Sequence, residues 1–259
     1  MKFLKDIIRS GLQTFGYDLR RQPTRLRFPV EFSDVEKKAF EHVRSHRLSM
    51  VSDERLFATI LACKHVIEQN IPGDFVECGV FRGGNAILAK ILFDAYGVDR
   101  KVWLFDTFLG MTKPLDVDVD SSSGEPAIEQ YEKMDRGGHN DWVFCPLDQV
   151  KAHFADAKLL DDQVIFVQGD VLQTLDSQPL PDAIAVLRLD TDWYESTKKE
   201  LEVLYPRLTT GGALLIDDYG HFQGAQKATD EYFAGPVNRP LLNYTDYTGR
   251  IGVKPTART

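Results

Sequence analysis

The chain has 259 residues, of which 43% are hydrophobic, and its 39 acidic and 31 basic side chains leave a net charge of −8. This length predicts one large domain or two small ones, with enough apolar material for a core. The acidity argues against nucleic acid as the main ligand. No stretch of 18 apolar residues is present to span a membrane, and the charged start is unlike a secretory signal, so we expect a cytoplasmic protein.

Aspartate and cysteine usage narrow the chemistry further. Asp outnumbers Glu by 26 to 13, and Asp favours helix caps, turns and metal sites over helix surfaces. The three cysteines, Cys63, Cys78 and Cys145, are odd in number and far apart. Their pattern excludes a disulfide framework and a cysteine-based zinc knuckle.

Residues 1–30 predict a basic amphipathic arm. Residues 1–29 hold seven bases against two acids, and apolar residues recur at helical spacing from Phe3 to Leu12. A membrane surface or an anionic partner is one interpretation, but a single short basic helix binds such surfaces weakly. We favour a helix that docks on the body or on a neighbouring subunit, so the N-terminal helices are where a homo-oligomer would form.

Helices and strands alternate through the rest of the chain. A capping box of Ser33 and Glu36 opens one helix, and Ser52 with Asp53 opens the next. Short apolar runs then predict buried parallel strands at Asp74–Cys78, Lys101–Phe105, Gln163–Gln168, Ala183–Leu189 and Ala213–Ile216. Helical patterns separate or follow these strands at Asn85–Tyr96, Leu147–Lys158, Ser196–Leu208 and Gln223–Phe233.

This alternation is typical of a doubly wound, Rossmann-like α/β sheet with right-handed crossovers. Pro240–Tyr244 and Arg250–Lys254 add a terminal antiparallel hairpin. Residues 31–259 are therefore expected to form one domain, preceded by the arm.

Residues 107–146 are far longer than an ordinary connection and show helical periodicity only at Ala127–Met134. We expect this segment to be a lid or substrate loop, or to be disordered. Asp116, Asp118 and Asp120 within it resemble an ion loop, but the Gly and distal Glu of a calcium loop are missing. A solvated acidic lid is the favoured interpretation.

A glycine-rich turn follows the first strand. Gly79, Gly83 and Gly84 would let the backbone approach a ligand closely, and the next helix offers free N–H groups. The spacing does not fit the GxGxxG motif of dinucleotide-binding sheets. Glu77 would repel a pyrophosphate but attract an ammonium group, as in a cofactor with an amino-acid end such as S-adenosylmethionine. An ordinary tight turn is the alternative.

Two further acids end predicted strands. Asp106 lies 22 residues after Gly84, where an acid accepts hydrogen bonds from ribose hydroxyls in nucleoside-binding sheets; capping of the next helix is the alternative. Asp170, followed by Val171, closes the third strand, and its side chain and the neighbouring N–H could read an adenine edge. That second signal is weak by itself.

Four aspartates are expected to meet at one edge of the sheet. Asp190 and Asp192 follow the fourth strand, and Asp217 and Asp218 follow the fifth; adjacent strands lie only ~4.8 Å apart. Such crowding is costly unless the groups are protonated or held by a cation. Oxygen ligands without His or Cys favour Mg²⁺ over Mn²⁺ or Ca²⁺. Helix capping could explain Asp192 and Asp218 but not the other two.

His139 and His221 could each act as a base, and His221 is the better placed because it follows the aspartates of the fifth strand. A histidine in a loop is more often merely solvated. No Ser/His/Asp nucleophile elbow or phosphate-binding P-loop is present.

Five blocks of sequence resemble the macrocin O-methyltransferase family over about residues 30–255. The blocks are Met50–Leu56, Phe75–Gly84, Leu187–Thr197, Leu204–Gly212 and Ile216–Gly220. Members are metal- and S-adenosylmethionine-dependent enzymes that methylate sugar hydroxyls of macrolides and related natural products. The resemblance implies a class I methyltransferase sheet of seven strands with N-terminal helical additions, often in an oligomer.

The resemblance also implies roles for single residues. It suggests Asp190, Asp217 and Asp218 as Mg²⁺ ligands, and Asp192, close to the ion, as a general base. Around the cofactor it places Met50, Ser52, Glu77, Gly79, Gly83, Asp106, Asp170 and Val171. Met50 and Ser52 would form a flap over the methionine end. The segment 107–146 would hold the substrate-facing residues, which are not transferable.

The function expected from these signals is methyl transfer from S-adenosylmethionine to a hydroxyl of a small-molecule acceptor, with a sugar diol favoured. Mg²⁺ would bind the diol and Asp192 would take the proton. A Mg²⁺-dependent hydrolase or phosphoesterase that uses the same aspartates is one alternative. A non-catalytic nucleoside-binding protein is another.

Overall fold

The structure is a computed structural model that describes residues 28–256. The chain divides into two compact units, Met1–Ser33 and Asp34–Thr259. In the first unit the described residues form a short turn, closed by the N–H of Phe32, which donates to the carbonyl of Pro29 at 3.1 Å. The basic amphipathic arm expected in residues 1–30 lies outside the described residues, apart from its last three positions.

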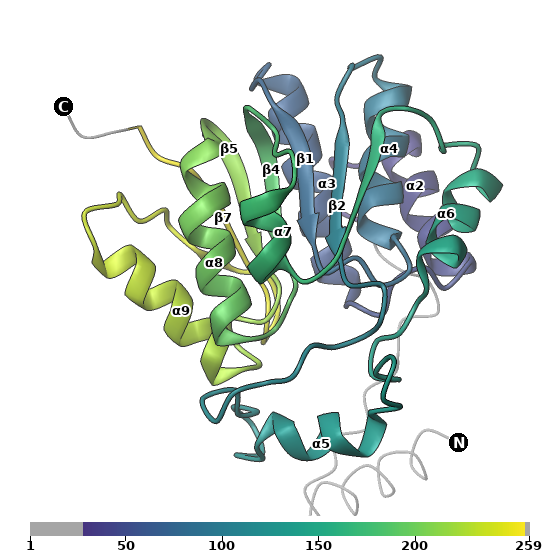
Figure 1. Cartoon of the computed structure of the whole chain (residues 1–259). Coiled ribbons are helices and arrows are strands. Elements are labelled where there is room, and N and C mark those ends of the chain that lie inside the picture. The colour runs from purple at the N-terminus through teal and green to yellow at the C-terminus, as the bar shows by residue number, and fades with distance from the viewer. Residues whose placement is uncertain (1–27, 257–259) are drawn as a thin grey trace, which may run out of the picture. The chain divides into compact units, whose positions relative to one another are not determined.

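The second unit is built on one seven-stranded sheet within the described residues (Figure 1). The strand order is β3-β2-β1-β4-β5-β7-β6, and β7 is antiparallel to both of its neighbours. The strands are β1 (Asp74–Cys78), β2 (Val102–Asp106), β3 (Val164–Gln168), β4 (Ile184–Leu189), β5 (Leu208–Ile216), β6 (Asn243–Tyr244) and β7 (Arg250–Val253). The expected seven-stranded, doubly wound sheet with a terminal hairpin is confirmed.

Helices cover both faces of this sheet. The helices are α2 (Asp34–Ser45), α3 (Asp53–Glu68), α4 (Gly84–Ala95), α5 (Ala127–Met134), α6 (Leu147–Asp156), α7 (Val171–Ser177), α8 (Tyr194–Leu204) and α9 (Gln223–Ala234). Helices α2, α3 and α4 pack together on one face, and α7, α8 and α9 on the other (Figure 1). Among residues 28–256 no helix is both long and apolar enough to cross a bilayer.

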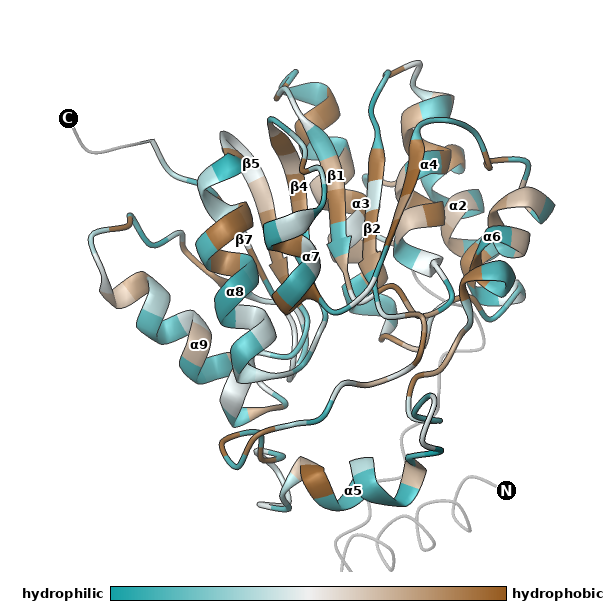
Figure 2. Ribbon diagram, in the orientation of Figure 1, coloured by the Kyte–Doolittle hydropathy of each residue, from teal (hydrophilic) through white to brown (hydrophobic). Residues whose placement is uncertain are grey.

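The central strands are buried on both faces, so they read as continuous apolar runs. Phe75 and Val76 of β1 and every residue of β4 are buried. Figure 2 shows this contrast, with brown strands between helices whose outer surfaces are teal. Polar side chains therefore concentrate where the parallel strands end, at the carboxyl edge of the sheet.

Two boundaries differ by four residues or more from the sequence-based expectation, and one helix was missed. The helix expected to reach Leu208 ends at Leu204, because Pro206 lies in a 3₁₀ turn. Strand β5 consequently begins at Leu208, well before the expected Ala213. The short helix α7 was not predicted at all, because seven residues are too few to show a clear helical period.

The segment 107–146 has defined structure, so disorder, one of the two interpretations left open for it, does not apply. It contains α5 and passes beyond the strand ends, away from both helical layers (Figure 1). Short antiparallel bridges join Val119 to Pro126 and Asp120 to Phe222. Trp142 packs edge-on against Trp193 at 5.5 Å between ring centroids. The segment therefore forms a wall at the carboxyl edge of the sheet.

Candidate functional site

The glycine turn after β1 is held tightly against its neighbours. Gly79 has φ +82°, and a Cβ at this position would overlap the carbonyl oxygen of Asp190. Its N–H donates to the carbonyl of Phe105 at 2.9 Å. The N–H groups of Val80 and Phe81 donate to Oδ2 of Asp106 at 2.6 and 3.2 Å. Only glycine fits at position 79, because the chain there is both left-handed and closely packed.

Asp106 ends β2 and organises this turn rather than capping a helix. Its Oδ1 accepts from the N–H of Phe108 at 2.6 Å, while its Oδ2 holds the turn. Burial raises the pKa of Asp106, and these N–H donors oppose that rise. Asp106 lines the central cavity, where a ligand could reach it. Its hydrogen bond to a ribose stays a prediction.

Glu77 does not reach the cavity, in contrast to Gly79. Its side chain is 1% exposed, and Oε1 accepts from Nη1 of Arg188 at 2.8 Å. Burial raises the pKa of Glu77 to about 7, although Arg188 opposes the rise. Glu77 is therefore the buried hydrogen-bond partner of Arg188 through Oε1, its Oε2 is buried without a hydrogen-bond partner, and its expected contact with a cofactor ammonium group stays a prediction.

Three aspartates converge at the carboxyl edge. One carboxylate oxygen each from Asp190, Asp192 and Asp218 lie within 4.8 Å of one another. Oδ2 of Asp218 is buried without a hydrogen-bond partner. Burial, and next the neighbouring carboxylates, raise the pKa of Asp192 and Asp218 well above the ordinary range. Among the described residues this is the group with the ligands and spacing for a metal ion.

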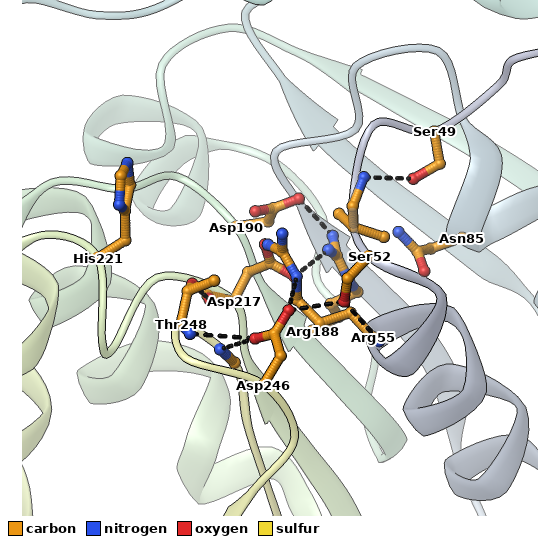
Figure 3. A network of polar contacts seen from close by, with 12 residues as sticks. Ser49, Ser52, Arg55, Asn85, Arg188, Asp190, Asp217, His221, Asp246 and Thr248 are labelled. Carbon is orange, nitrogen blue, oxygen red and sulfur yellow. Dashed lines mark hydrogen bonds and ion pairs between the residues drawn. The ribbon is translucent and has the colours of Figure 1, made fainter. Parts of the chain in front are cut away.

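Asp217 faces two arginines beside this group. Arg188 and Arg55 each donate to one of its carboxylate oxygens. The hydroxyl of Thr248 donates to its main-chain carbonyl. Figure 3 shows Arg55, Arg188, Asp190 and Asp217 drawn together from α3, β4 and the end of β5. The carboxylate of Asp217, predicted from the sequence as a metal ligand, is therefore oriented by two arginine side chains.

Arg188 links the ends of β4 and β5 through its bonds to Asp190 and Asp217. It is almost fully buried, and Nη1 also donates to Asp190 at 2.5 Å. A buried guanidinium needs several carboxylates around it, which Glu77, Asp190 and Asp217 provide. Sequence reasoning missed this residue, although a lone arginine inside an apolar strand was a visible signal.

Arg55 and Asp246 were also missed. Nε of Arg55 lies 3.0 Å from Oδ2 of Asp246, and Oγ of Ser52 donates to the same oxygen at 2.6 Å. Oδ1 of Asp246 accepts from the N–H groups of Thr248 and Gly249 at 3.0 and 2.7 Å. This network fastens the β6–β7 turn to the start of α3 (Figure 3). The partners are too far apart in the sequence for spacing rules to connect them.

One cavity of about 290 Å³ joins the glycine turn to the aspartates. Of the residues expected around a cofactor, those that line it are Met50, Gly79, Asp106, Asp170 and Val171. Asp190, Asp192, Asp217, Asp218 and Arg55 line it as well. Other residues of its wall include Met111, Thr112, Trp142, Val143, His221, Phe222 and Tyr247. The segment 107–146 thus contributes directly to the cavity.

Ser52 and Gly83 are not in the cavity wall. Ser52 caps α3, accepting from the N–H of Arg55 at 3.1 Å. Gly83 starts α4 with φ +83°, and a Cβ there would press on Phe154 and Val150. Both residues support neighbours of the cavity, and their expected contacts with a cofactor stay predictions.

Local roles of other acids are now visible. Asp170 caps α7 by accepting from the N–H of Leu172 at 2.9 Å. Asp192 does not cap α8: Oδ1 of the buried Asp118 accepts from the N–H of Tyr194 instead, at 2.8 Å. The prediction that Asp118 is solvated is therefore wrong, because its carboxylate is a buried helix cap.

The two histidines differ in position. His221 lines the cavity, and its Nε2 lies 3.6 Å from Oδ2 of Asp120. His139 lies outside the cavity wall, stacked on Phe144 at 4.3 Å and bonded to Asp141 at 3.0 Å. The structure therefore favours His221 over His139 as a residue that can reach a ligand.

Comparisons with known proteins give a consistent match. The chain is 41% identical over 172 residues to an 8-demethyl-8-(2,3-dimethoxy-alpha-L-rhamnosyl)-tetracenomycin-C 4′-O-methyltransferase of Streptomyces olivaceus, covering 66% of this chain and 62% of that protein. It is 32% identical over 230 residues to a mycinamicin III 3″-O-methyltransferase of Micromonospora griseorubida, covering 88% and 86% of the two chains.

A solved structure and a family model agree with these relatives. The structure of the O-methyltransferase NovP superposes with a TM-score of 0.71 and 34% identity, covering 81% of this chain and 83% of that one. The sequence model described as macrocin-O-methyltransferase (TylF) matches residues 12–250. The chain belongs to the macrocin O-methyltransferase (TylF) family.

Proposed function

We propose that this protein transfers a methyl group from S-adenosylmethionine to a hydroxyl of a sugar or glycosylated natural product, with Mg²⁺ at the aspartates. One observation carries the proposal: a single cavity brings the glycine turn and Asp106 next to the group of Asp190, Asp192 and Asp218. A nucleoside-bearing cofactor and a cation can therefore meet in one space.

The cofactor end of the cavity supports S-adenosylmethionine. Gly79 exposes bare backbone, Asp106 lies at the end of β2, and Val171 offers an apolar contact beside Asp170. Acids at strand ends accept ribose hydroxyls in sheets of this kind. The acidic surroundings also suit the positive sulfonium of the reactant. The relatives named above are O-methyltransferases by description.

The aspartates fit a hard divalent ion. The proposed ligands are Asp190, Asp217 and Asp218, and the unpartnered buried oxygen of Asp218 is an open ligand position. The arginine bonds to Asp217 do not exclude it, because a carboxylate offers about four lone-pair sites. Bound there, Mg²⁺ would supply positive charge that favours ionisation of a neighbouring acceptor hydroxyl.

Asp192 is the proposed general base. It lies beside Asp190 and Asp218 at the cavity wall and has φ +69°, a conformation that non-glycine residues seldom adopt. Its carboxylate would accept the hydroxyl proton while the acceptor oxygen bonds to the methyl carbon and the carbon–sulfur electron pair returns to sulfur. Holding both reactants in line supplies much of the remaining acceleration, ~7–11 kcal/mol at best.

The acceptor side is proposed to be the wall formed by the segment 107–146 and the β6–β7 turn. The descriptions of both relatives place the methyl group on a numbered oxygen, and that of the tetracenomycin enzyme names a rhamnosyl group. Met111, Trp142 and Tyr247 give this wall apolar and aromatic surface, which suits a sugar ring or aglycone. A cytoplasmic location and assembly through the N-terminal helices stay predictions of the sequence.

Calorimetry and a methyl-transfer screen test the function together. S-adenosylhomocysteine should bind the purified protein, and a panel of sugar diols with S-adenosylmethionine should give a product heavier by one methylene group. Activity should fall in EDTA and return with Mg²⁺. Absence of cofactor binding would refute the methyltransferase proposal, and full activity in EDTA would refute the metal.

A further inference from the structure

The aspartates of β4 are presented by an unusual turn. The N–H of Trp193 donates to the carbonyl of Thr191 at 2.8 Å, and Asp192, between them, has φ +69°. A three-residue turn with positive φ at its centre is rare and strained for a residue other than glycine. Something in the surrounding structure must therefore hold this turn in place.

Contacts on three sides hold it. The carbonyl of Asp190 lies against Gly79, leaving no room for a Cβ there. On the far side, Asp118 accepts from the N–H of Tyr194, the first residue of α8. The third contact comes from α8 itself: the hydroxyl of Thr191 donates to Oε1 of Glu200 at 2.8 Å.

Glu200 is an unexpected residue at this position. It is 0% exposed, and its second oxygen, Oε2, is buried without a hydrogen-bond partner. Burying a carboxyl group with an unsatisfied oxygen is unfavourable. Such a group persists when its contacts are needed: its Oε1 accepts from Thr191, between Asp190 and Asp192, and the thiol of Cys78 at the end of β1 lies beside it.

We propose that Glu200 is a positioning residue that, through the hydroxyl of Thr191, fixes the strained turn presenting Asp190 and Asp192 to the cavity. The proposal rests on the proposed function, in which Asp190 is a ligand and Asp192 is the base. Without this hydrogen bond the turn relaxes, and both carboxylates lose their place relative to Asp218.

The decisive variant is Thr191→Val, which removes the hydroxyl at nearly constant size. Its matched control is Thr229→Val in α9, because Thr229 is also buried and donates to a carbonyl, that of Ala225, at 2.8 Å. Thr191→Val should lower kcat on the order of 10- to 100-fold, since small misplacements at a reacting centre have effects of this size. The control should keep the wild-type kcat.

Two binding measurements separate positioning from a general loss of structure. The affinity for Mn²⁺, read by electron paramagnetic resonance without cofactor, should fall about tenfold in Thr191→Val, as it does when a bond that orients a ligand is lost. The affinity for S-adenosylhomocysteine should stay within about twofold in both variants, because the glycine turn is untouched. Unchanged kcat and Mn²⁺ affinity in Thr191→Val would overturn the proposal.

Substitutions of Glu200 supply the second half of the test. Glu200→Gln keeps an acceptor oxygen for Thr191, so it should lose less kcat than Glu200→Met, which keeps only the length. Glu200→Met combined with Thr191→Val should be no worse than either alone, since both remove one bond. Additive losses would show that the two residues act independently and would contradict the proposal.

Hydrogen exchange distinguishes this proposal from the proposed function. Amides of residues 190–196 should exchange faster in Thr191→Val than in Thr229→Val. If the wild type neither binds Mn²⁺ nor transfers a methyl group, the proposed function fails, and exchange alone then decides the positioning role. Unchanged exchange in that segment overturns it in either case.

Discussion

Gly79 and Asp190 touch through their backbones, so closely that a Cβ on Gly79 would overlap the carbonyl oxygen of Asp190. The N–H of Asp190 also donates to the carbonyl of Cys78 at 2.8 Å. The turn proposed to receive the cofactor and the turn proposed to hold the metal are therefore one packed unit. A side chain added at Gly79 is therefore expected to displace Asp190 as well as the glycine turn.

Gly79→Ala should disturb both halves of the site. The substitution forces a left-handed alanine, costing ~1–2 kcal/mol, and adds a backbone overlap that costs ~1–3 kcal/mol more. Urea unfolding should show that sum as a lower free energy of unfolding, and calorimetry should show at least a tenfold weaker affinity for S-adenosylhomocysteine.

Gly97→Ala is the control for that experiment. Gly97 has φ +67°, but a Cβ there would meet nothing within 4 Å. It should show the conformational cost alone, ~1–2 kcal/mol, with unchanged cofactor affinity. Equal losses in the two variants would mean that the contact between Gly79 and Asp190 has no energetic weight.

Asp218→Asn should weaken metal binding and methyl transfer while sparing cofactor binding. The variant loses a carboxylate whose Oδ2 is buried and unpartnered, so Mn²⁺ affinity and methyl transfer should fall at least tenfold. S-adenosylhomocysteine should bind as in the wild type. Asp116→Asn, an exposed acid of the segment 107–146, is the control, and an Asp218→Asn enzyme active in EDTA would refute the metal assignment.

Asp192→Asn and Asp217→Asn together decide which carboxylate is ligand and which is base. If Asp192 is the base, its variant should lower kcat with nearly intact Mn²⁺ affinity, whereas Asp217→Asn should weaken Mn²⁺ binding. The reverse result would assign the ligand role to Asp192, in agreement with its grouping with Asp190 and Asp218. Unchanged turnover in Asp192→Asn would move the base role to His221 or to water.

The sequence predicted most of the sheet because each buried strand carries its own local signal. Strand β1 was expected at Asp74–Cys78 and found there. A short apolar run bounded by Gly and Asp predicts a buried strand without any information on distant partners. The convergence of Asp190 and Asp218 also followed from strand order alone. Such features depend on neighbours in the sequence or on one rule of topology.

The remaining features depend on partners that are distant in the sequence. Arg55 meets Asp217 across 162 positions, and Ser52 meets Asp246 across 194. The conformation of the segment 107–146 depends on individual contacts such as that of Trp142 with Trp193. Such contacts leave no periodic pattern in the sequence from which they could be predicted. The contact of Glu77 with Arg188 was missed for the same reason, because the two residues lie 111 positions apart.

Stability should fall as the pH rises through neutrality. Burial raises the pKa of Glu200 from 4.5 to about 8 and that of Glu77 to about 7. Between these pH values the folded chain keeps protons on Glu200 and Glu77 that the unfolded chain has released. The free energy of unfolding is therefore highest below about pH 4.5 and decreases as the pH rises to about 8. At about 1.4 kcal/mol for each pH unit, the change is on the order of a few kcal/mol.

Glu200→Gln checks this origin, because the amide does not ionise. The free energy of unfolding, measured by urea titration from pH 5 to pH 8.5, should decline less steeply than in the wild type. Glu202→Gln, at an exposed position of the same helix, should retain the wild-type slope. Identical slopes in all three proteins would show that Glu200 titrates in the folded chain as it does in the unfolded one.

Asp118→Ala should loosen the segment 107–146 from α8. Asp118 is 0% exposed, and its carboxylate accepts from the N–H of Tyr194 and from that of Leu115, each at 2.8 Å. Loss of a helix cap costs ~0.5–2 kcal/mol, and here the same change also frees the loop that carries the cap. We expect a lower urea midpoint and faster proteolysis within residues 107–146.

Asp116→Ala provides the comparison for Asp118, because Asp116 lies two positions earlier in the same segment and is exposed. Its proteolysis and unfolding should match those of the wild type. In Asp118→Ala, KM for the acceptor should also rise, because Met111, Thr112 and Trp142 of this segment line the cavity, while the affinity for S-adenosylhomocysteine should hold. A rise in KM without faster proteolysis would place Asp118 in contact with the acceptor itself and would contradict its role as the cap that fastens the wall.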